Sequence, residues 1–132
     1  MQSLGIELVS WLPGSATVRI ETQKDHGNLA GSVHGGVLFA LADAAFEVAS
    51  NSYGRVAVAL DTACHYSQPA EVGGELTAGA SEMARTRRTA SYRIDVRTPD
   101  GELVAWYMAL AYRTKDWHLG EERWPQEWRD AH

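Results

Sequence analysis

The chain opens with two short segments rich in apolar residues, 6–11 and 16–22, and in the second of them apolar and polar residues alternate. Side chains point to opposite faces of a strand in turn, so this period and the apolar run before it predict two β-strands. Pro13 and Gly14 lie between the segments and predict a tight turn. The polar, glycine-containing segment 23–33 that follows predicts a loop.

The segment 36–52 has a different character, because it is rich in Ala and Leu and has no internal Gly or Pro. Its length and residue preferences predict a long helix, and Gly54 stands where such a helix would stop. Most faces of this helix would be apolar. We therefore expect it to be buried inside the protein rather than to lie on the surface.

Four further strands are predicted at 56–66, 75–85, 89–98 and 103–114. Pro99, Asp100 and Gly101 predict a hairpin turn between the last two. In 89–98 the even positions are apolar and the odd positions are polar, which is typical of a sheet with one face on a core. The order of elements predicts an α+β fold in which a long antiparallel sheet wraps around one buried central helix.

The last residues, 115–132, form a segment of different composition that contains Trp117, Trp124 and Trp128. Pro125 suits the first position of a helix, and the four-residue spacing of Trp124 and Trp128 puts both on one helix face. We expect one domain over 1–114 and a Trp-rich tail over 115–132. The tail should form a short helix that docks on the body or on a second subunit.

Composition narrows the class of protein. The 132 residues suit one domain, and 45% hydrophobic with 22% charged residues is typical of a soluble globular protein. The net charge of −5 argues against broad nucleic-acid binding. No apolar run approaches the roughly 18 residues of a membrane span, and the first residues do not resemble a signal peptide. Cys64 is the single cysteine, so no intrachain disulfide is expected, and a reducing cytoplasm fits.

One residue of the predicted helix does not fit its surroundings. Asp43 stands between Ala42 and Ala44, one turn from Phe39 and Phe46. An ionised carboxylate is costly in an apolar place unless it has a partner, and desolvation raises its pKa. Asp43 is therefore a candidate catalytic acid or base. The alternative is that it points out of the helix into solvent.

The turn before this helix carries the second candidate feature. Gly35 and Gly36 would place backbone N–H groups at the positive end of the helix, where another molecule can approach closely and an oxyanion could be stabilised. Asn28 and His34 flank the turn and could hold a water or a carbonyl group. The alternatives are a loop asparagine that bonds its own backbone and a histidine that fixes the loop. His26 and His34 are eight residues apart with no cysteine nearby, so no metal site is expected.

These motifs resemble a known family. Segment 28–36 (NLAGSVHGG), followed by 41–46 (LADAAF) and 50–54 (SNSYG), is similar to the phenylacetate-degradation (PaaI-like) thioesterases, and the similarity continues to about residue 114. The resemblance implies the hotdog fold. It also implies a homodimer whose two sheets join, often paired again into a dimer of dimers, in which Asp43 faces Gly35 of the partner subunit and Asn28 of the partner subunit.

The resemblance also implies the reaction, the hydrolysis of acyl-CoA thioesters such as aryl-acetyl-CoA or medium-chain acyl-CoA. Asp43 would act as base or nucleophile, the Gly35 N–H would polarise the carbonyl, and Asn28, His34 and Gly36 would hold substrate or water. No cofactor is required, because coenzyme A is part of the substrate. Some relatives use a Ser or Thr on the next strand to orient the water. The aligned candidates here are Ala59, Asp61 and Thr62, so that function is expected to be weak or missing.

Coenzyme A carries phosphates, and an acidic protein needs a local cationic site to bind them. Arg85, Arg87 and Arg88 cluster at a predicted strand turn next to Thr89, and we expect this edge to contact coenzyme A. The alternative for each arginine is a solvated surface position. Two other functions remain open, a hotdog hydratase for enoyl or hydroxyacyl thioesters and a non-catalytic acyl-CoA-binding domain.

Overall fold

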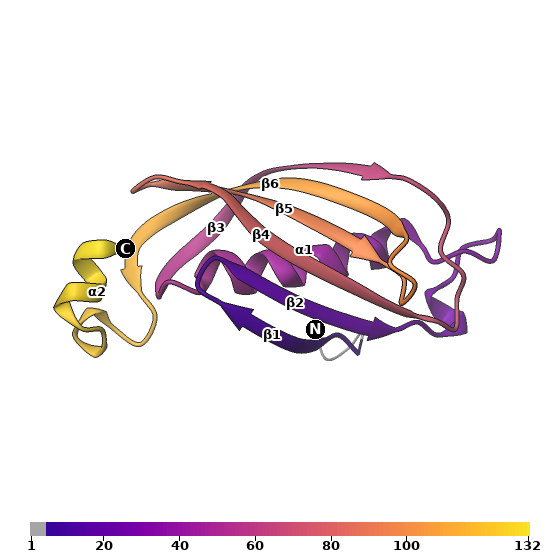
Figure 1. The fold of residues 1–132 in the computed structure, drawn as a ribbon, viewed down its shortest axis with the longest axis horizontal. Coiled ribbons are helices and arrows are strands. Elements are labelled where there is room, and N and C mark those ends of the chain that lie inside the picture. The colour runs from indigo at the N-terminus through magenta and orange to yellow at the C-terminus, as the bar shows by residue number, and fades with distance from the viewer. Residues whose placement is uncertain (1–4) are drawn as a thin grey trace.

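The computed structural model describes residues 5–132. Within them the elements follow the predicted order of two strands, a helix and four strands (Figure 1). The strands are β1 (Glu7–Leu12), β2 (Ser15–Glu21), β3 (Arg55–Tyr66), β4 (Glu75–Arg85), β5 (Thr89–Arg97) and β6 (Leu103–Trp117), and the long helix is α1 (Gly35–Asn51). The short elements are η2 (Lys24–His26), η3 (Glu121–Arg123) and α2 (Gln126–Ala131).

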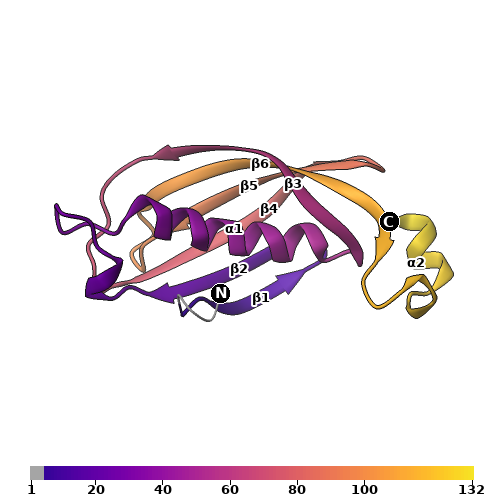
Figure 2. The same cartoon turned by 180° about the vertical axis from the view of Figure 1, so that it is seen from behind.

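The six strands form one antiparallel sheet in the order β1-β2-β4-β5-β6-β3. Figure 2 shows α1 lying across one face of this curved sheet. The predicted α+β architecture, a long sheet around one central helix, is confirmed. Among the described residues, no helix is both long enough and apolar enough to cross a membrane.

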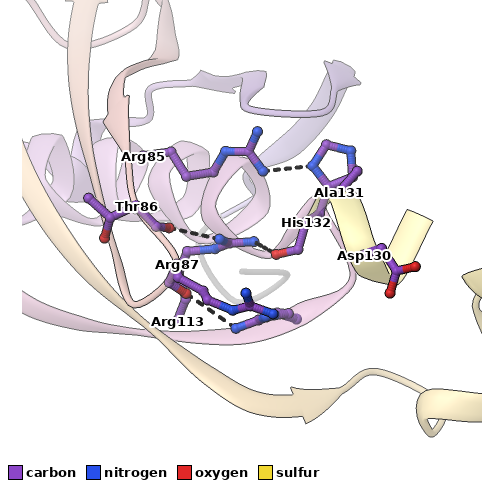
Figure 3. A pocket seen from close by; sticks show the side chains of 8 residues that line it. Arg85, Thr86, Arg87, Arg113, Asp130, Ala131 and His132 are labelled. Atoms are coloured by element: carbon purple, nitrogen blue, oxygen red, sulfur yellow. Dashed lines mark hydrogen bonds between the residues drawn. The ribbon is translucent and has the colours of Figure 1, made fainter. Parts of the chain in front are cut away.

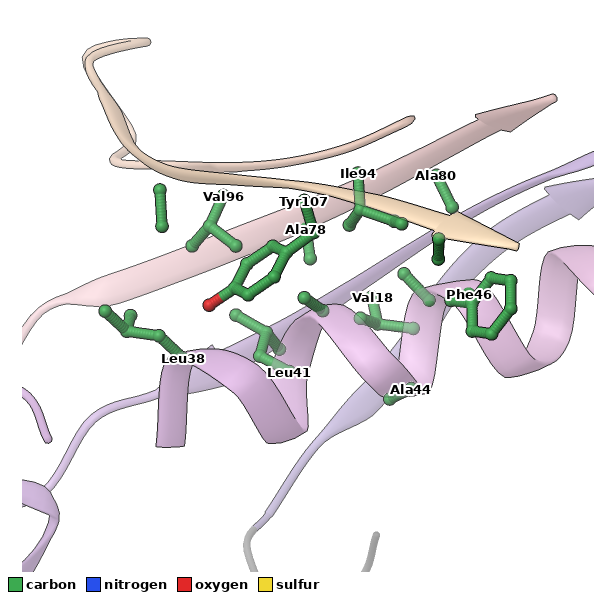
Figure 4. Close-up of a cluster of buried hydrophobic side chains, with 14 of the residues drawn as sticks. Val18, Leu38, Leu41, Ala44, Phe46, Ala78, Ala80, Ile94, Val96 and Tyr107 are labelled. Atoms are coloured by element: carbon green, nitrogen blue, oxygen red, sulfur yellow. The ribbon is translucent and has the colours of Figure 1, made fainter. Parts of the chain in front are cut away.

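The core lies between α1 and the inner face of the sheet (Figure 4). The even positions of β5, which include Tyr92 and Ile94, are buried there as their alternation predicts. The ring of Tyr92 meets Phe46 of α1 edge to face, with the ring centroids 5.7 Å apart. Alanines such as Ala78 and Ala45 fill much of the remaining interface, so the helix can approach the sheet closely.

The prediction that α1 is buried on most faces is wrong for the chain taken alone. Gly36, Phe39, Asp43 and Glu47 are exposed and recur every three or four residues, so they form one stripe along the helix. The sheet covers the opposite side. The stripe cannot be recognised from the sequence, because one of its exposed residues, Phe39, is hydrophobic.

Strand β3 forms one edge of the sheet and is exposed along much of its length. Val58 and Leu60 are 49% and 57% exposed. The pairing of β3 with β6 slips between Ala59 and Asp61, which is a β-bulge. A long edge strand with apolar side chains offers unpaired backbone groups to another strand.

The tail packs on the body of its own chain. β6 runs to Trp117, so the strand extends three residues beyond the predicted domain end at 114. Pro125 is the residue that caps α2, one position before its predicted place as the first helical residue. Trp124 precedes α2, so the two tryptophans do not share a helix face as predicted, although their rings stack with centroids 6.4 Å apart. The Trp128 indole N–H donates to the Tyr53 carbonyl oxygen at 2.6 Å.

Candidate active site

The loop before α1 is closed by the side chain of Asn28. Its Oδ1 accepts hydrogen bonds from the backbone N–H groups of Ala30, at 2.9 Å, and Ser32, at 3.1 Å. This is the local bonding that the alternative for Asn28 describes. The oxygen is therefore committed to the loop, and the amide nitrogen is the part of Asn28 that can serve a ligand.

His34 caps the N-terminus of α1. Its Nδ1 accepts a hydrogen bond from the Gly36 N–H at 2.8 Å, so Nδ1 carries no proton and the neutral ring has its proton on Nε2. The imidazole is exposed, which leaves the Nε2–H available as a donor. His34 thus fixes the loop, as the alternative for this residue describes, and its Nε2–H remains free to bind a ligand.

The backbone N–H of Gly35 is the one donor in the first turn of α1 that His34 does not bind. The N–H groups of Val37 and Leu38 both bond to the His34 carbonyl oxygen, and Gly36 bonds to the ring. Among residues 5–132 the Gly35 N–H donates to no protein acceptor. It stands at the positive end of a 17-residue helix, where a negatively charged oxygen is stabilised.

Tyr66 of β3 covers the other side of this peptide. Its hydroxyl lies 3.4 Å from the Gly35 carbonyl oxygen, as a donor to it. A Cβ atom at Gly35 would come within 3.2 Å of the same hydroxyl oxygen, so glycine allows the close approach. Sequence reasoning missed Tyr66 as a site residue, because nothing in the alternation of β3 marks which end of the strand passes the loop.

Beside this turn is a hollow of about 540 Å³, which we call the loop hollow. It is lined by Asn28, Ala30, Ser32, Val33, Gly35, Leu38, Tyr66, Ser67, Gln68, Pro69 and Ala70. Apolar walls with a few polar groups are typical of sites for small organic molecules. The predicted residues Asn28 and Gly35 thus share one hollow with Tyr66.

Asp43 lies elsewhere. It is eight positions further along the helix than Gly35, which is about 12 Å along the axis. It lines a small cavity of its own, which we call the Asp43 cavity, with Phe39, Ala42, Phe46, Thr62, Ile94, Tyr107 and Ala109. Although Asp43 is exposed, these side chains displace enough water that desolvation raises the pKa of its carboxyl group. One chain therefore does not bring Asp43 together with Gly35 and Asn28.

The β-bulge in β3 decides which water-positioning candidate reaches Asp43. Thr62 pairs with Ala109, faces inward and lines the Asp43 cavity. Asp61 pairs with Leu110 on the outer face. Of the three candidates, Thr62 is therefore the one that shares a cavity with Asp43, because the extra residue at the bulge turns Thr62 inward where strict alternation from Ala59 would not.

Tyr107 of β6 is a second aromatic residue that the sequence did not reveal. It lines the Asp43 cavity, and its ring stands edge to face against Phe39 and Tyr66, with centroids 6.0 and 6.5 Å away. Its hydroxyl is buried with no hydrogen-bond partner among the described residues, and desolvation raises the pKa of Tyr107. Tyr107 and Tyr66 thus connect the two cavities.

The arginines predicted to contact coenzyme A divide in the structure. Arg85 and Arg87 line a third hollow near the end of α1 opposite Gly35, together with Arg55 and Arg113. Arg88 and Thr89 do not line it, and the Thr89 hydroxyl bonds instead with that of Thr86 at 2.9 Å inside the β4–β5 turn. Among residues 5–132, no group of three His, Cys, Asp or Glu side chains is arranged to hold a metal ion.

Comparison with known proteins identifies relatives of this chain. The model of the thioesterase superfamily matches residues 30–105, which include Gly35, Asp43 and Thr62. Acyl-coenzyme A thioesterase PaaI of Escherichia coli is 33% identical over 91% of this chain and 86% of its own. A mutant of the phenylacetic acid degradation protein PaaI from Thermus thermophilus is 42% identical over 86% of this chain and 97% of its own, with a TM-score of 0.83. A Streptococcus mutans protein solved bound to acetyl CoA is 26% identical over 83% of this chain and 88% of its own, with a TM-score of 0.79.

Proposed function

The chain belongs to the thioesterase superfamily, and from that membership we propose that it hydrolyses acyl-CoA thioesters with Asp43 as the catalytic carboxylate and the Gly35 N–H as the oxyanion donor. The predicted resemblance to PaaI-like thioesterases and the hotdog fold are confirmed by the same relatives. The observation that carries the proposal is the Gly35 amide, which is free of protein acceptors among the described residues and opens on the loop hollow.

The reaction needs two things that these residues supply. Attack on the thioester carbonyl places negative charge on its oxygen, and the Gly35 N–H at the helix terminus stabilises that charge. Asp43 either removes a proton from the attacking water or attacks the carbonyl itself, after which water releases the acid. In both routes the carbon–sulfur bond breaks, coenzyme A leaves as the thiol, and the hydroxyl of water ends in the carboxylic acid. Thr62, which lines the same cavity as Asp43, would orient the water.

A second copy of the chain would complete the site. Asp43 and Gly35 line separate cavities in one chain, whereas the exposed stripe of α1 and the β3 edge lie open. Pairing of two β3 edges would join the sheets and bring Asp43 to Gly35 of the partner subunit and Asn28 of the partner subunit. We propose this homodimer as the active unit, with a dimer of dimers as the larger assembly.

The walls of the loop hollow support the proposed substrate class. Val33, Leu38 and Pro69 offer an apolar surface for an aryl-acetyl or medium-chain acyl group, and His34 with the Asn28 amide can hold the polar end near Gly35. Coenzyme A would place its phosphates toward the cationic β4–β5 edge that carries Arg85, Arg87, Arg88 and Thr89.

Release of free thiol from a panel of acyl-CoA substrates tests the proposal. We expect Asp43→Asn and Asp43→Ala to lower kcat by about 10²–10⁴-fold, the usual contribution of a positioned general base. Glu47→Gln is the matched control, because Glu47 lies one turn further along the same exposed stripe and loses the same charge. No thiol release by the wild type, or full activity of Asp43→Asn, would contradict the proposal. Hydration of an enoyl-CoA without hydrolysis would favour the hydratase.

A further inference from the structure

Two adjacent glycines begin α1, and the peptide group that joins Gly35 to Gly36 has no Cβ on either side. Glycine adopts many backbone conformations, so such a peptide group rotates easily unless other groups hold it. The Gly35 N–H and the capping ring of His34 both belong to this turn. The orientation of the Gly35–Gly36 peptide therefore decides in which directions these two donors point.

Side chains hold this peptide group from both ends. The Gly36 N–H donates to His34 Nδ1 at 2.8 Å, and the Gly35 carbonyl oxygen accepts from the Tyr66 hydroxyl at 3.4 Å. Hydrogen bonds in a chain polarise one another, so a donor on the carbonyl oxygen strengthens the N–H of the same peptide as a donor. The Tyr66 hydroxyl, the peptide and the imidazole thus form one hydrogen-bonded chain that ends at the exposed Nε2–H of His34.

Tyr66 is not fixed by packing alone, because it is the last residue of β3 and is 54% exposed. Its ring stands edge to face against Tyr107, at an interplanar angle of 87°. The two residues lie on the inner face of neighbouring strands, where Tyr66 pairs with Ala105 and Cys64 pairs with Tyr107. Tyr107 is therefore the buried side chain against which the Tyr66 ring can rest.

The hydroxyl of Tyr107 has no function in the site described so far. Tyr107 is 1% exposed, and its hydroxyl is buried with no hydrogen-bond partner among residues 5–132. Figure 4 shows this hydroxyl pointing toward Leu38, at the end of α1 where the glycine turn lies. Desolvation raises the pKa of Tyr107, and the neighbouring Tyr66 hydroxyl raises it further. A buried hydroxyl without a partner is costly, and the Tyr66 oxygen is an acceptor beside it.

We propose that Tyr66 is a positioning residue of the thioesterase site, because its hydroxyl pins the Gly35–Gly36 peptide. With this peptide pinned, the Gly35 N–H and the His34 Nε2–H keep the directions in which both can meet a thioester. Tyr107 anchors the Tyr66 hydroxyl from the buried side. The catalytic consequence rests on the proposed function, whereas the pinning itself is a property of the free chain and can be measured without substrate.

Long-range proton–nitrogen NMR of the full chain, which reports the tautomer of a histidine, tests the pinning. We expect His34 of the wild type to carry its proton on Nε2, and Tyr66→Phe to raise the fraction with a proton on Nδ1 about threefold, because the bond from Gly36 weakens. Phenylalanine keeps the ring and removes only the hydroxyl. An unchanged His34 tautomer in Tyr66→Phe would overturn the proposal.

Tyr112→Phe is the matched control. Tyr112 is a partly exposed tyrosine of β6 that lines neither the loop hollow nor the Asp43 cavity. It should leave the His34 tautomer and the rate of thiol release as they are in the wild type. An equal effect of Tyr112→Phe would mean that loss of any tyrosine hydroxyl disturbs the turn, and would overturn the assignment to Tyr66.

Steady-state thiol release tests the catalytic consequence. Tyr66→Phe should lower kcat about tenfold and change KM by less than about twofold, because a misdirected oxyanion donor acts mainly on the transition state. Tyr107→Phe should also lower kcat, but not in a chain that already carries Tyr66→Phe, because the Tyr107 hydroxyl acts only through Tyr66. Both variants should melt no lower than about 2 °C below the wild type, since neither loses a ring from the core. Full kcat in Tyr66→Phe, or additive losses in the double variant, would contradict this chain of contacts.

The two proposals fail separately. A shifted His34 tautomer in Tyr66→Phe, together with no thiol release by the wild type, would refute the thioesterase function and leave the pinned peptide standing. Thiol release by the wild type, together with full activity and an unchanged tautomer in Tyr66→Phe, would refute the positioning function of Tyr66 alone.

Discussion

The capping of α1 by His34 and its proposed contact with the substrate can be separated by a pair of substitutions. Its Nδ1 caps α1 through the Gly36 N–H at 2.8 Å, and its exposed Nε2–H is free to donate to a substrate. Asparagine keeps an acceptor at the cap position, because its Oδ1 lies where the histidine Nδ1 lies, but it cannot reach as far with its donor. Alanine removes both groups. His34→Asn and His34→Ala therefore test chemistry and capping independently.

The expected magnitudes differ between the two variants. Loss of a cap costs about 1 kcal/mol of stability. For a domain of this size 1 kcal/mol lowers the melting temperature by about 2–5 °C, so His34→Ala should melt lower by that amount and His34→Asn should stay near the wild type. A hydrogen bond to a charged group contributes about 1.5–3 kcal/mol, so both variants should lose about 10–150-fold in kcat/KM if the Nε2–H contacts the developing oxyanion or the substrate.

Scanning calorimetry and a steady-state thiol-release assay measure these effects. All variants must be compared at one protein concentration, because an assembly that forms from the folded chain makes the melting temperature depend on concentration. Full kcat/KM in His34→Asn would mean that the imidazole serves only as a cap. An unchanged melting temperature in His34→Ala would refute the argument that its Nδ1 stabilises the helix start.

Other variants test the remaining parts of the site. Desolvation raises the pKa of Asp43, so the acid limb of kcat/KM should lie above the usual range for aspartate. The raised pKa also means that stability falls as pH rises through it, so Asp43→Asn should melt higher than the wild type at neutral pH while losing activity. Thr62→Val should lower kcat about tenfold with little change in melting temperature, and Thr62→Ser should restore it, because the hydroxyl faces the Asp43 cavity. Gly54→Ala should destabilise the chain by about 1–3 kcal/mol and change tryptophan fluorescence, since Gly54 has φ +102° and its added Cβ would meet Trp124 at 2.7 Å.

Local sequence predicted much of the fold because strands such as β5 carry an alternation that survives packing. The even positions of β5, such as Tyr92 and Ile94, point to the core as their alternation requires. Proline and glycine at 13–14 and 99–101 mark turns because these residue types favour turn geometry. These features are decided within a few residues, so they can be read without tertiary contacts.

The features that the sequence could not reveal depend on contacts between distant segments. The bulge after Ala59 follows from how β3 pairs with β6, and it turns Thr62 toward Asp43 against simple alternation. The hollow lined by Arg55, Arg85, Arg87 and Arg113 (Figure 3) also depends on contacts between distant segments. Arg87 and Arg88 are neighbours in sequence, yet Arg87 meets Arg55 and Arg113 in the hollow because β3, β6 and the β4–β5 turn converge there. Sequence adjacency therefore cannot tell which of the clustered arginines share a hollow.

Asp43 shows how the two interpretations of one residue can both hold. It is exposed, as the alternative of a solvent-facing residue requires, yet the side chains around it desolvate the carboxyl group. Phe39 on the same stripe is 41% exposed, and β3 is an edge strand that pairs with β6 on one side only. A solvent-facing helix gains nothing from such neighbours, whereas a helix that meets a second copy would bury them. The exposure of Asp43 in one chain thus supports its proposed pairing with Gly35 of the partner subunit, since only an open stripe can receive that loop.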